Sequence, residues 1–444
     1  MDNIIPFYTN DGSVGLYSID DNDIFHSVYG ALSEAYDKFV LPANFNYFFK
    51  DNNEIKILDL CFGIGYNSKV FLNEIFSKNV FLTENNETIH TDNNFNNKYS
   101  DKIDTNKINK LKYNFSIYSN NILKKKFFKK IINREKKCDK LKIKIDAIDV
   151  NENLMKLSPL LKTCTAFLRQ RMTGIDKVDK YIYSGKKFKS KYKLKNEVNL
   201  LILMSIVDKY GQEYLSETFC ELIKSKKWHN FISEDMRHFM KFYISSKGIC
   251  LPQSNKMSFL HNIYYKYISK SYKNTLKVLE NNEISFNGII DDARHFLLSN
   301  DEIYDFIFLD AFSPKKCPNL WTFDFFKLLY SHLSENGKIL TYSNSPAVRN
   351  AFIKNNFYIG KIYNDNENRY TGTIAVKNAD LIKYKLSKYE YGLLNTRAGI
   401  MYSDKNLNDS NEIILQRRIN DFNESTLISA TKYINDFKGD KNEI

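Results

Sequence analysis

The chain has 444 residues, enough for two or three domains of about 150 residues each, so a large buried core is available. Its 43% hydrophobic and 26% charged residues, with 16 Gly and 7 Pro, exclude collagen-like and Pro/Gly-rich disordered classes. The longest apolar run, 200–207, falls far short of the roughly 18 residues that a membrane helix needs. We therefore expect a globular protein with no membrane span.

The formal net charge is +13, and the basic surplus is concentrated in 121–144 and 180–195. Such stretches attract phosphates, although a genome-wide bias toward Lys and Asn explains them equally well. The six cysteines form no CxxC pair, which is typical of reduced thiols and argues against disulfides and a metal site. Residues 1–12 lack the basic and apolar regions of a secretory signal, so we expect a cytoplasmic location.

A strand, a glycine loop and a helix are predicted near the N-terminus. After a first helix over 27–40, with apolar residues at helical spacing, the aliphatic run 55–61 is typical of a buried parallel strand. It ends at Gly63 and Gly65, and a helix is predicted over 67–76. This order is the opening unit of a doubly wound α/β sheet.

Two insertions are predicted to interrupt that sheet. The segment 84–110 contains 8 Asn and little apolar sequence, so it indicates a surface insertion extending over about 78–140. A second central strand follows at 141–150. The segment 161–279 is expected to be a mostly helical insertion, with helices over 197–210, 213–224 and 261–279.

The alternation of strands and helices returns after the second insertion. We expect strands at 284–289, 304–310 and 338–342, and helices at 322–333 and 347–355. The sequence therefore predicts a Rossmann-like, mainly parallel α/β sheet split between 51–160 and 280–380. Residues 1–50 and 381–444 are expected to be extensions of this domain.

The glycine loop favours one class of cofactor over another. In Asp59-Leu60-Cys61-Phe62-Gly63-Ile64-Gly65 the two glycines let the backbone approach a ligand at the strand's carboxyl end. Ser68 stands where the third glycine of a dinucleotide fingerprint belongs, which weakens the NAD and FAD interpretations. An acidic residue followed by GxG is common in S-adenosylmethionine methyltransferases, although an unrelated glycine turn remains an alternative.

Three further acidic residues follow predicted strands. Asp149 is placed to bind ribose hydroxyls, but it lies 84 residues after Gly65, and a cap of the next helix is the alternative role. Asp292 either meets the adenine amino group or caps a helix. Asp310 ends a buried apolar strand, where a charge is costly unless it serves a site, so we expect it to be functional.

Four segments, in order, resemble the methyltransferase domain of MnmC-like enzymes. They are HSVYGALSE at 26–34, FGIGYN at 62–67, DAFSPKKCPNLWT at 310–322, and YS at 342–343 with AVR at 347–349. The resemblance covers about 10–75, 141–155 and 280–376, and Asp291 departs from it by replacing a usual glycine. No second Gly-rich strand and helix opening follows residue 377, so we expect a stand-alone methyltransferase without the FAD-dependent half.

The resemblance implies a class I methyltransferase fold, S-adenosyl-L-methionine as cofactor and tRNA as partner. The implied reaction methylates the primary amine of 5-aminomethyl-2-thiouridine at the wobble position. It implies Asp310 as the catalytic residue that orients this amine and helps its proton leave. The expected cofactor-binding residues are Asp59, Gly63, Gly65, Asn67, Asp149 and Asp292, and the expected substrate-binding residues are Glu34, Phe312, Lys315, Lys316, Tyr342 and Arg349.

These roles have plainer alternatives. Phe312, Tyr66 and Tyr342 either wall the sulfonium pocket or are ordinary core aromatics. Lys315, Lys316 and Arg349 either clamp anticodon phosphates or are simply solvated. Three other functions compete: another class I N-methyltransferase, a non-catalytic RNA-binding relative, and an aminopropyltransferase, whose Gly-Gly-Gly-Asp loop is lacking. The sequence predicts no oligomeric state.

Overall fold

The computed structural model describes a large part of the chain. Its described residues are 3–20, 22–48, 52–78, 142–162, 173–181, 192, 194, 196–237, 240, 283–364 and 368–437. Residues 1–78 and 141–444 form one compact unit. The predicted Asn-rich insertion, the helix over 261–279 and most of the two basic stretches lie outside the described residues.

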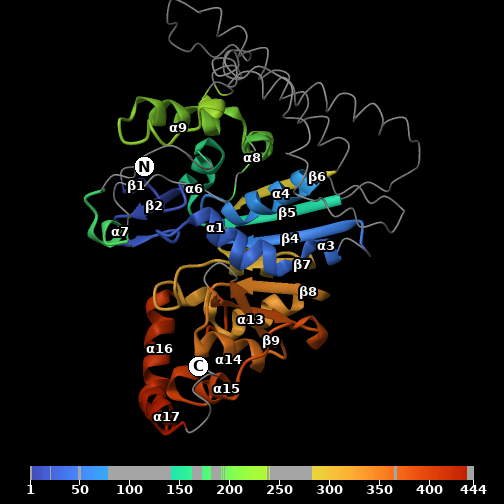
Figure 1. Cartoon of the computed structure of the whole chain (residues 1–444), viewed down its shortest axis with the longest axis vertical. Coiled ribbons are helices and arrows are strands. Elements are labelled where there is room, and N and C mark those ends of the chain that lie inside the picture. The colour runs from blue at the N-terminus through green and yellow to red at the C-terminus, as the bar shows by residue number, and fades with distance from the viewer. Residues whose placement is uncertain are drawn as a thin grey trace, which may run out of the picture. The chain divides into compact units, whose positions relative to one another are not determined.

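A seven-stranded sheet forms the centre of this unit (Figure 1). Its spatial order is β6-β5-β4-β7-β8-β10-β9; the first five of these strands are parallel, and β10 runs antiparallel to both β8 and β9. The strands are β4 (Glu54–Leu60), β5 (Lys142–Asp149), β6 (Ile284–Ile290), β7 (Tyr304–Leu309), β8 (Leu333–Thr341), β9 (Tyr358–Asn364) and β10 (Arg369–Val376). The predicted Rossmann-like, mainly parallel sheet is therefore confirmed.

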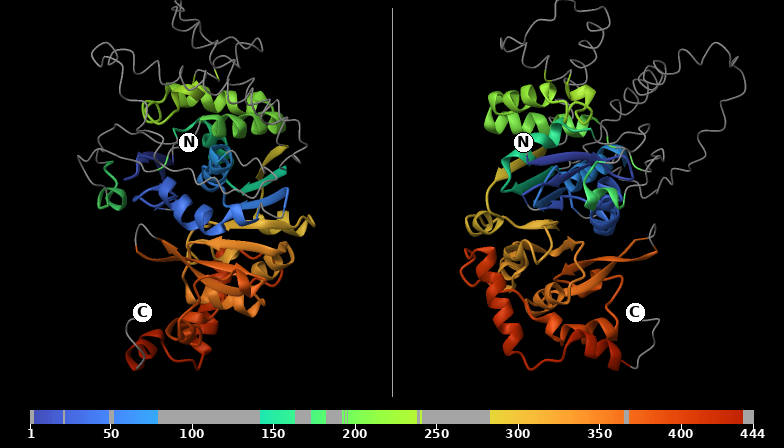
Figure 2. Two further views of the ribbon diagram at one scale, coloured as in Figure 1. Left: turned by 45° about the vertical axis from the view of Figure 1, so that its right-hand side comes forward. Right: turned by 90° about the vertical axis from the view of Figure 1, so that its left-hand side faces the viewer.

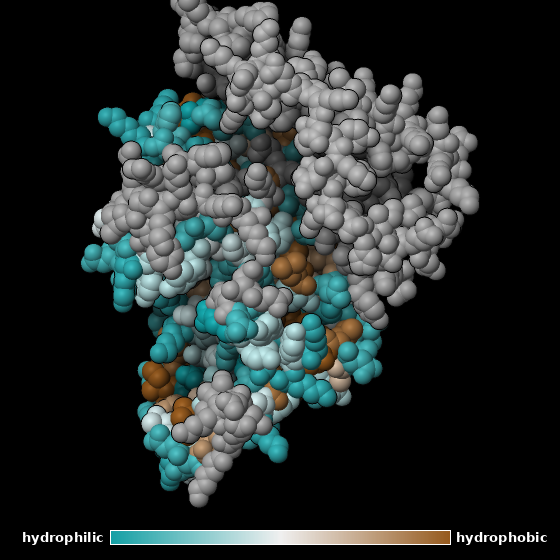
Figure 3. Space-filling model, viewed as in Figure 1, coloured by the Kyte–Doolittle hydropathy of each residue, from teal (hydrophilic) through white to brown (hydrophobic). Residues whose placement is uncertain are grey.

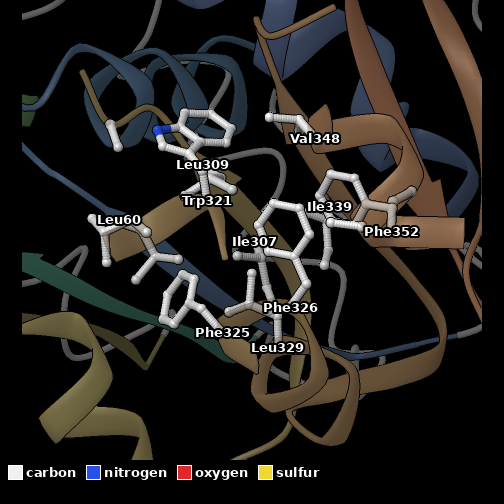
Figure 4. Packing of buried hydrophobic residues seen from close by; sticks show 14 of the residues in the cluster. Leu60, Ile307, Leu309, Trp321, Phe325, Phe326, Leu329, Ile339, Val348 and Phe352 are labelled. Carbon is white, nitrogen blue, oxygen red and sulfur yellow. The ribbon is translucent and has the colours of Figure 1, made fainter. Parts of the chain in front are cut away.

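Helices that follow the strands bury the sheet. They are α4 (Tyr66–Lys78), α6 (Glu152–Leu157), α12 (Ala293–Leu298), α13 (Phe323–Ser331) and α14 (Pro346–Lys354). The aromatic rings of Trp321, Phe326 and Phe352 gather beside Ile307 and Ile339, as Figure 4 shows. Phe326 and Phe352 stack with their ring centroids 4.0 Å apart. Apolar residues line both β7 and β8. Their packing in this core fixes the position of the two strands and therefore of the sheet edge at which they end.

The N-terminal segment differs from its prediction. It forms a small antiparallel sheet of β1 (Ile4–Tyr8), β2 (Val14–Ser18) and β3 (Asp23–Ile24). The helix expected over 27–40 begins only at Ala31 in α1 (Ala31–Ala35), because a turn closed by Gly30 N–H on Ser27 O precedes it. It then widens into the π-helix η1 (Tyr36–Val40), followed by α2 (Leu41–Ala43) and α3 (Phe45–Phe48).

The predicted helices over 197–210 and 213–224 are confirmed as α8 (Asn196–Tyr210) and α9 (Gln212–Lys224), which lie side by side in both views of Figure 2. The short α7 (Asp176–Asp179) precedes them. Helix α8 is apolar on most of its faces and packs on β6, where the Tyr210 hydroxyl donates to Gly288 O at 2.8 Å. The hydroxyl thus ties this helical segment to the sheet.

The C-terminal part adds α15 (Lys388–Leu394), α16 (Asn411–Glu424) and α17 (Ala430–Asp436). Helix α15 begins with a capping box in which Ser387 and Glu390 exchange side-chain and backbone bonds. Within the described ranges, none of the helices is long and apolar enough to cross a bilayer. On the face shown in Figure 3 the described side chains are mainly hydrophilic, with apolar ones in small separate groups.

Candidate active site

The glycine loop makes a sharp turn at the carboxyl end of β4. Cys61, Gly63 and Gly65 have φ angles of 61°, 57° and 80°, and Gly65 N–H closes the turn on Phe62 O at 2.7 Å. A side chain at position 65 would place its Cβ 2.2 Å from Cζ of the Phe62 ring, so only glycine fits there. At position 63 the nearest atom to such a Cβ is His26 Nε2, at 3.8 Å.

Asp59 lies inside β4, beneath this loop. One carboxylate oxygen accepts from Ser68 N at 3.2 Å and from Ser68 Oγ at 2.5 Å, which fixes the first turn of α4. The other oxygen has no hydrogen-bond partner among the described residues. Burial, together with the charges of Asp310 and Asp149, raises the pKa of this carboxyl to about 7. Asp59 therefore supports the loop from within rather than lining its outer rim.

Asp149 joins two loops at the end of β5. Its carboxylate accepts from Gly63 N at 2.7 Å and from Asn151 N at 2.8 Å, and burial raises its pKa to about 6. The alternative that Asp149 caps the following helix is wrong, because Asn151 is the N-cap of α6 and accepts from Asn153 N. The carboxyl group therefore lies at the edge of the sheet that carries the glycine loop, where the sequence predicts that a ribose binds.

Asp292 acts as the N-cap of α12. Its carboxylate accepts from Arg294 N at 2.8 Å and forms an ion pair with the Arg294 guanidinium at 2.8 Å. Burial raises its pKa, but these bonds to Arg294 outweigh burial and lower it overall. Arg294 also pairs with Asp404 at 2.7 Å. The structure thus shows Asp292 as a helix cap. Asp292 still lies at the same edge of the sheet as Asp149, since the neighbouring Asp291 N–H donates to Asp149 O.

Asp310 directly follows β7 and faces the glycine loop. Its carboxylate accepts from Asn67 Nδ2 at 3.0 Å. Burial and the charge of Glu34 raise its pKa to about 7, while the Asn67 bond and the charge of Lys38 lower it. Asn67 and Asp310 were predicted separately, as cofactor and catalytic residues, and the structure places them in contact.

Glu34 brings the N-terminal segment to Asp310. Its carboxylate accepts from Ser27 N at 3.0 Å and forms an ion pair with Lys38, one helical turn later. The Lys38 ammonium lies 5.8 Å from the centroid of the Tyr342 ring. The Tyr342 hydroxyl donates to Ala311 O at 2.8 Å, so this ring is fixed beside Asp310.

The segment that carries Phe25 lies on the loop after Asp310. The rings of Phe25 and Phe312 are 5.3 Å apart, and Lys316 pairs with Asp23 at 2.7 Å. Lys315 is exposed. Phe312 and Lys316 therefore hold the N-terminal segment in place. Of the two lysines predicted to bind phosphates, only Lys315 has no acidic partner among the described residues.

Arg349 requires a correction. Its side chain is buried, and its three nitrogen groups bind Thr373 Oγ1, Glu390 Oε1 and Asn344 Oδ1 at 2.9–3.0 Å. These contacts leave its guanidinium no exposed face for a phosphate. Arg349 joins α14 to β10 and α15, because a buried guanidinium needs partners for all its donors.

We predict that Arg349→Met lowers the free energy of unfolding by about 1–3 kcal/mol, because Thr373 and Asn344 lose their donor and Glu390 loses one of the two ion pairs that it forms with described residues. Urea titration measures this. The exposed Lys315→Met should leave stability unchanged and weaken RNA binding instead. An Arg349→Met protein of normal stability but weakened RNA binding would restore the phosphate role.

Two side chains of this site escaped the sequence analysis. Lys38 stands four residues after Glu34, and that helical spacing was the available indication of their ion pair. Lys69 is buried under the loop and donates to Ser158 O at 2.6 Å, and burial lowers its pKa to about 7. Nothing in the sequence marks Lys69 as buried. Among the described residues, no group of three or more metal-ligating side chains is placed to hold a metal ion.

Comparison with known proteins finds one matching family and one solved structure of similar fold. Residues 255–378 match a family described as S-adenosyl-L-methionine-dependent methyltransferase. The crystal structure of MNMC2 from Aquifex aeolicus is similar in fold, with 18% identity and a TM-score of 0.51, over 95% of this chain and 86% of that one.

Two curated relatives match shorter stretches. The uncharacterized protein MJ0670 of Methanocaldococcus jannaschii is 29% identical over 30% of this chain and 38% of its own length. A polyamine aminopropyltransferase of Buchnera aphidicola is 29% identical over 31% of this chain and 53% of its own length. The chain thus spans only about half or less of the curated relatives it matches. The match over 255–378 agrees with the predicted resemblance to a methyltransferase domain, and S-adenosyl-L-methionine is the cofactor of the matched family. The likeness to the MNMC2 structure shows a shared fold.

Proposed function

We propose that the chain is a tRNA methyltransferase that transfers the methyl group of S-adenosyl-L-methionine to the primary amine of 5-aminomethyl-2-thiouridine at the wobble position. The observation that carries the proposal is the placement of Asp310 and Glu34 beside the glycine loop. Two neighbouring carboxyl groups fit an amine acceptor, and the loop fits an adenosyl donor. The four segments that resemble MnmC-like enzymes support the choice of substrate.

The residues present fit the cofactor. Asp59, Asp149 and Asp310 form no ion pair with a lysine or arginine in the described part of the chain, so their edge of the sheet is electronegative. S-adenosyl-L-methionine supplies an electrophilic methyl group on a cationic sulfonium, which such an edge attracts. Asp149 is placed for the ribose, and Asp59 supports the loop from beneath.

Catalysis in this proposal depends on the alignment of the reacting atoms and on the removal of one proton from the acceptor amine. A methyl transfer requires the amine, the methyl carbon and the sulfur in line, so orientation supplies most of the rate. Asp310 accepts one proton from the acceptor amine, and Asn67 holds its carboxylate in place. Tyr342 and Phe312 wall the acceptor side, where their faces favour cationic groups.

We expect the rate to rise with pH through about 7. Asp310 must be ionised to accept a proton, and burial with the Glu34 charge raises its pKa to about 7. The carboxyl is therefore mostly protonated and inactive at pH 5–6. A profile of kcat/KM between pH 5 and 9 measures this, and a lower inflection near pH 4 would contradict it.

The direct test uses nucleosides. The purified chain is incubated with labelled S-adenosyl-L-methionine and tRNA from a strain that accumulates 5-aminomethyl-2-thiouridine. Mass spectrometry of the wobble nucleoside should show the methylamino product. Transfer to another base or to protein would favour a different N-methyltransferase. Binding of tRNA without any transfer would favour the non-catalytic alternative.

Aminopropyl transfer is the second candidate, because part of the chain is similar to polyamine aminopropyltransferases. That reaction uses decarboxylated S-adenosylmethionine and releases methylthioadenosine, whereas methyl transfer releases S-adenosylhomocysteine. Chromatography of the nucleoside product distinguishes the two. The missing Gly-Gly-Gly-Asp loop argues for methyl transfer.

A further inference from the structure

A lysine ammonium occupies the surroundings proposed for the acceptor amine. Lys38 pairs with Glu34, lies 5.8 Å from the centre of the Tyr342 ring, and acts electrostatically on Asp310. Its side chain is only 18% exposed. Glu34 and the Tyr342 ring thus already flank one alkyl ammonium, which is chemically the same group as a protonated acceptor.

These surroundings create a difficulty for the reaction. An alkyl amine has a pKa near 10, so it arrives mostly protonated at neutral pH. The carboxyl groups of Asp310 and Glu34 favour the ammonium further, because opposite charges stabilise the charged form. An ammonium has no lone pair to attack the methyl group. A neighbouring positive charge has the opposite effect and favours the neutral amine.

We propose that Lys38 is a positioning residue whose ammonium, held by Glu34 beside Tyr342, repels the charge of the acceptor and so favours its neutral, nucleophilic form. The inference rests on the proposed function, since it requires an amine acceptor at Asp310. Lys38 does not touch the methyl group. It acts through the charge that it places near the acceptor nitrogen.

The step balances in protons and electrons. The acceptor ammonium gives one proton to the Asp310 carboxylate, and the freed lone pair forms the bond to the methyl carbon. The bond between that carbon and sulfur breaks, and its electron pair stays on sulfur as a neutral thioether. The product is a secondary ammonium, and the Asp310 proton leaves to solvent.

Other charged and titratable groups near η1 are engaged elsewhere. The elements packed against η1 are α1, α2, α4, β8 and β9, and from α1 only Glu34 forms an ion pair with Lys38 in the described part of the chain. The charged groups of η1 and these elements include Asp37, which accepts from Tyr192; Glu74, beside Tyr36; Lys69, which donates to Ser158 O; Lys338, which donates to Ala43 O; and Lys361, which pairs with Glu390. The charge of Glu34 also acts on His26, which precedes α1.

Lys156 provides a matched control that tests whether the role of Lys38 is purely structural. Lys156 pairs with Glu152, also four residues earlier, and its ammonium lies 4.2 Å from the Tyr214 ring centre. Its side chain is 19% exposed, against 18% for Lys38. Lys156→Met therefore removes the same kind of ion pair and ring contact from α6 without changing the charge at Asp310.

The test is a pH profile of kcat and KM for the full chain with tRNA bearing the aminomethyl uridine, at saturating S-adenosyl-L-methionine. Lys38→Met should lower kcat at pH 7 by about 10-fold, move the alkaline inflection up by about one pH unit, and recover near pH 10. KM for the tRNA should stay equal or fall, because the ammonium form binds the carboxyl groups more tightly. Lys38→Arg should keep the wild-type profile, and so should Lys156→Met.

A rate loss that is the same at every pH, or a raised KM with an unshifted profile, would show that Lys38 is structural and would overturn the inference. The same holds if Lys156→Met shifts the profile as Lys38→Met does. A wild-type chain that transfers no methyl group at any pH would overturn the proposed function, and this inference with it. An active wild type with an unshifted Lys38→Met profile overturns the inference alone.

Discussion

Replacing Asp310 by asparagine is expected to lower methyl transfer by about 10²–10⁴-fold, the usual contribution of one acid–base group. The amide keeps the shape of the carboxyl, and its oxygen can still accept the bond from Asn67. It cannot take a proton from the acceptor amine. The affinity for S-adenosyl-L-methionine, measured by calorimetry, should change only a few-fold, because Asp59 and Asp149 remain. Single-turnover assays with tRNA measure the rate.

A second aspartate of the same strand provides the control. Asp305 lies at the other end of β7, where its carboxylate accepts from Lys56 N and Ser334 Oγ. Asp305→Asn removes a half-buried charge from β7 without touching the site, so it should leave the transfer rate unchanged. If Asp310→Asn turned over normally, the assigned role of Asp310 would be wrong.

Gly65→Val is expected to abolish binding of S-adenosyl-L-methionine and to destabilise the protein. Position 65 has a φ of 80°, which a β-branched residue rarely adopts, and its Cβ would overlap the Phe62 ring at 2.2 Å. The loop must therefore change shape, and with it the Gly63 N–H that Asp149 holds. We expect at least a 100-fold weaker binding by calorimetry and a lower melting temperature.

Gly211 allows strain to be separated from the clash. It has a φ of 82°, and nothing lies within 4 Å of a Cβ added there. Gly211→Val thus carries the same backbone strain, of order 1–3 kcal/mol, outside the proposed site. It should lower stability and leave cofactor affinity intact. Undiminished binding by Gly65→Val would reject the cofactor role of the loop.

The strands and helices that carry the site were accessible from sequence because their patterns are local. An aliphatic run followed by two glycines predicts a buried strand and a tight turn, and the observed β4 and its loop agree. The N-terminal segment was harder. Its apolar spacing fits a single helix over 27–40, but the turn before Ala31 depends on a bond between Gly30 and Ser27 that the spacing does not show.

The sequence did not predict which side chains bind one another inside the fold. Arg349 looked like a phosphate ligand because it stands in a family segment, yet Glu390, 41 residues later, binds it inside the fold. Asp149 was predicted to bind a ribose, with capping of the next helix as the alternative. Asn151 caps that helix instead, and Asp149 binds Gly63 N, 86 residues earlier. Such contacts depend on which strands become neighbours, and no local pattern records that.

The amino-acid order alone determined the alternating architecture, the glycine turn after β4 and the acidic residues at or just after the ends of β5, β6 and β7, since these follow from nearest-neighbour chemistry and periodicity. Folding in three dimensions decided which carboxyl groups became buried, with a raised pKa at Asp310, and which cation stands among them. The physical reason is that desolvation and Coulomb interactions act through space. The role proposed for Lys38 depends on its position beside Tyr342, which is 304 residues away along the chain. Only the packed sheet brings the two residues together.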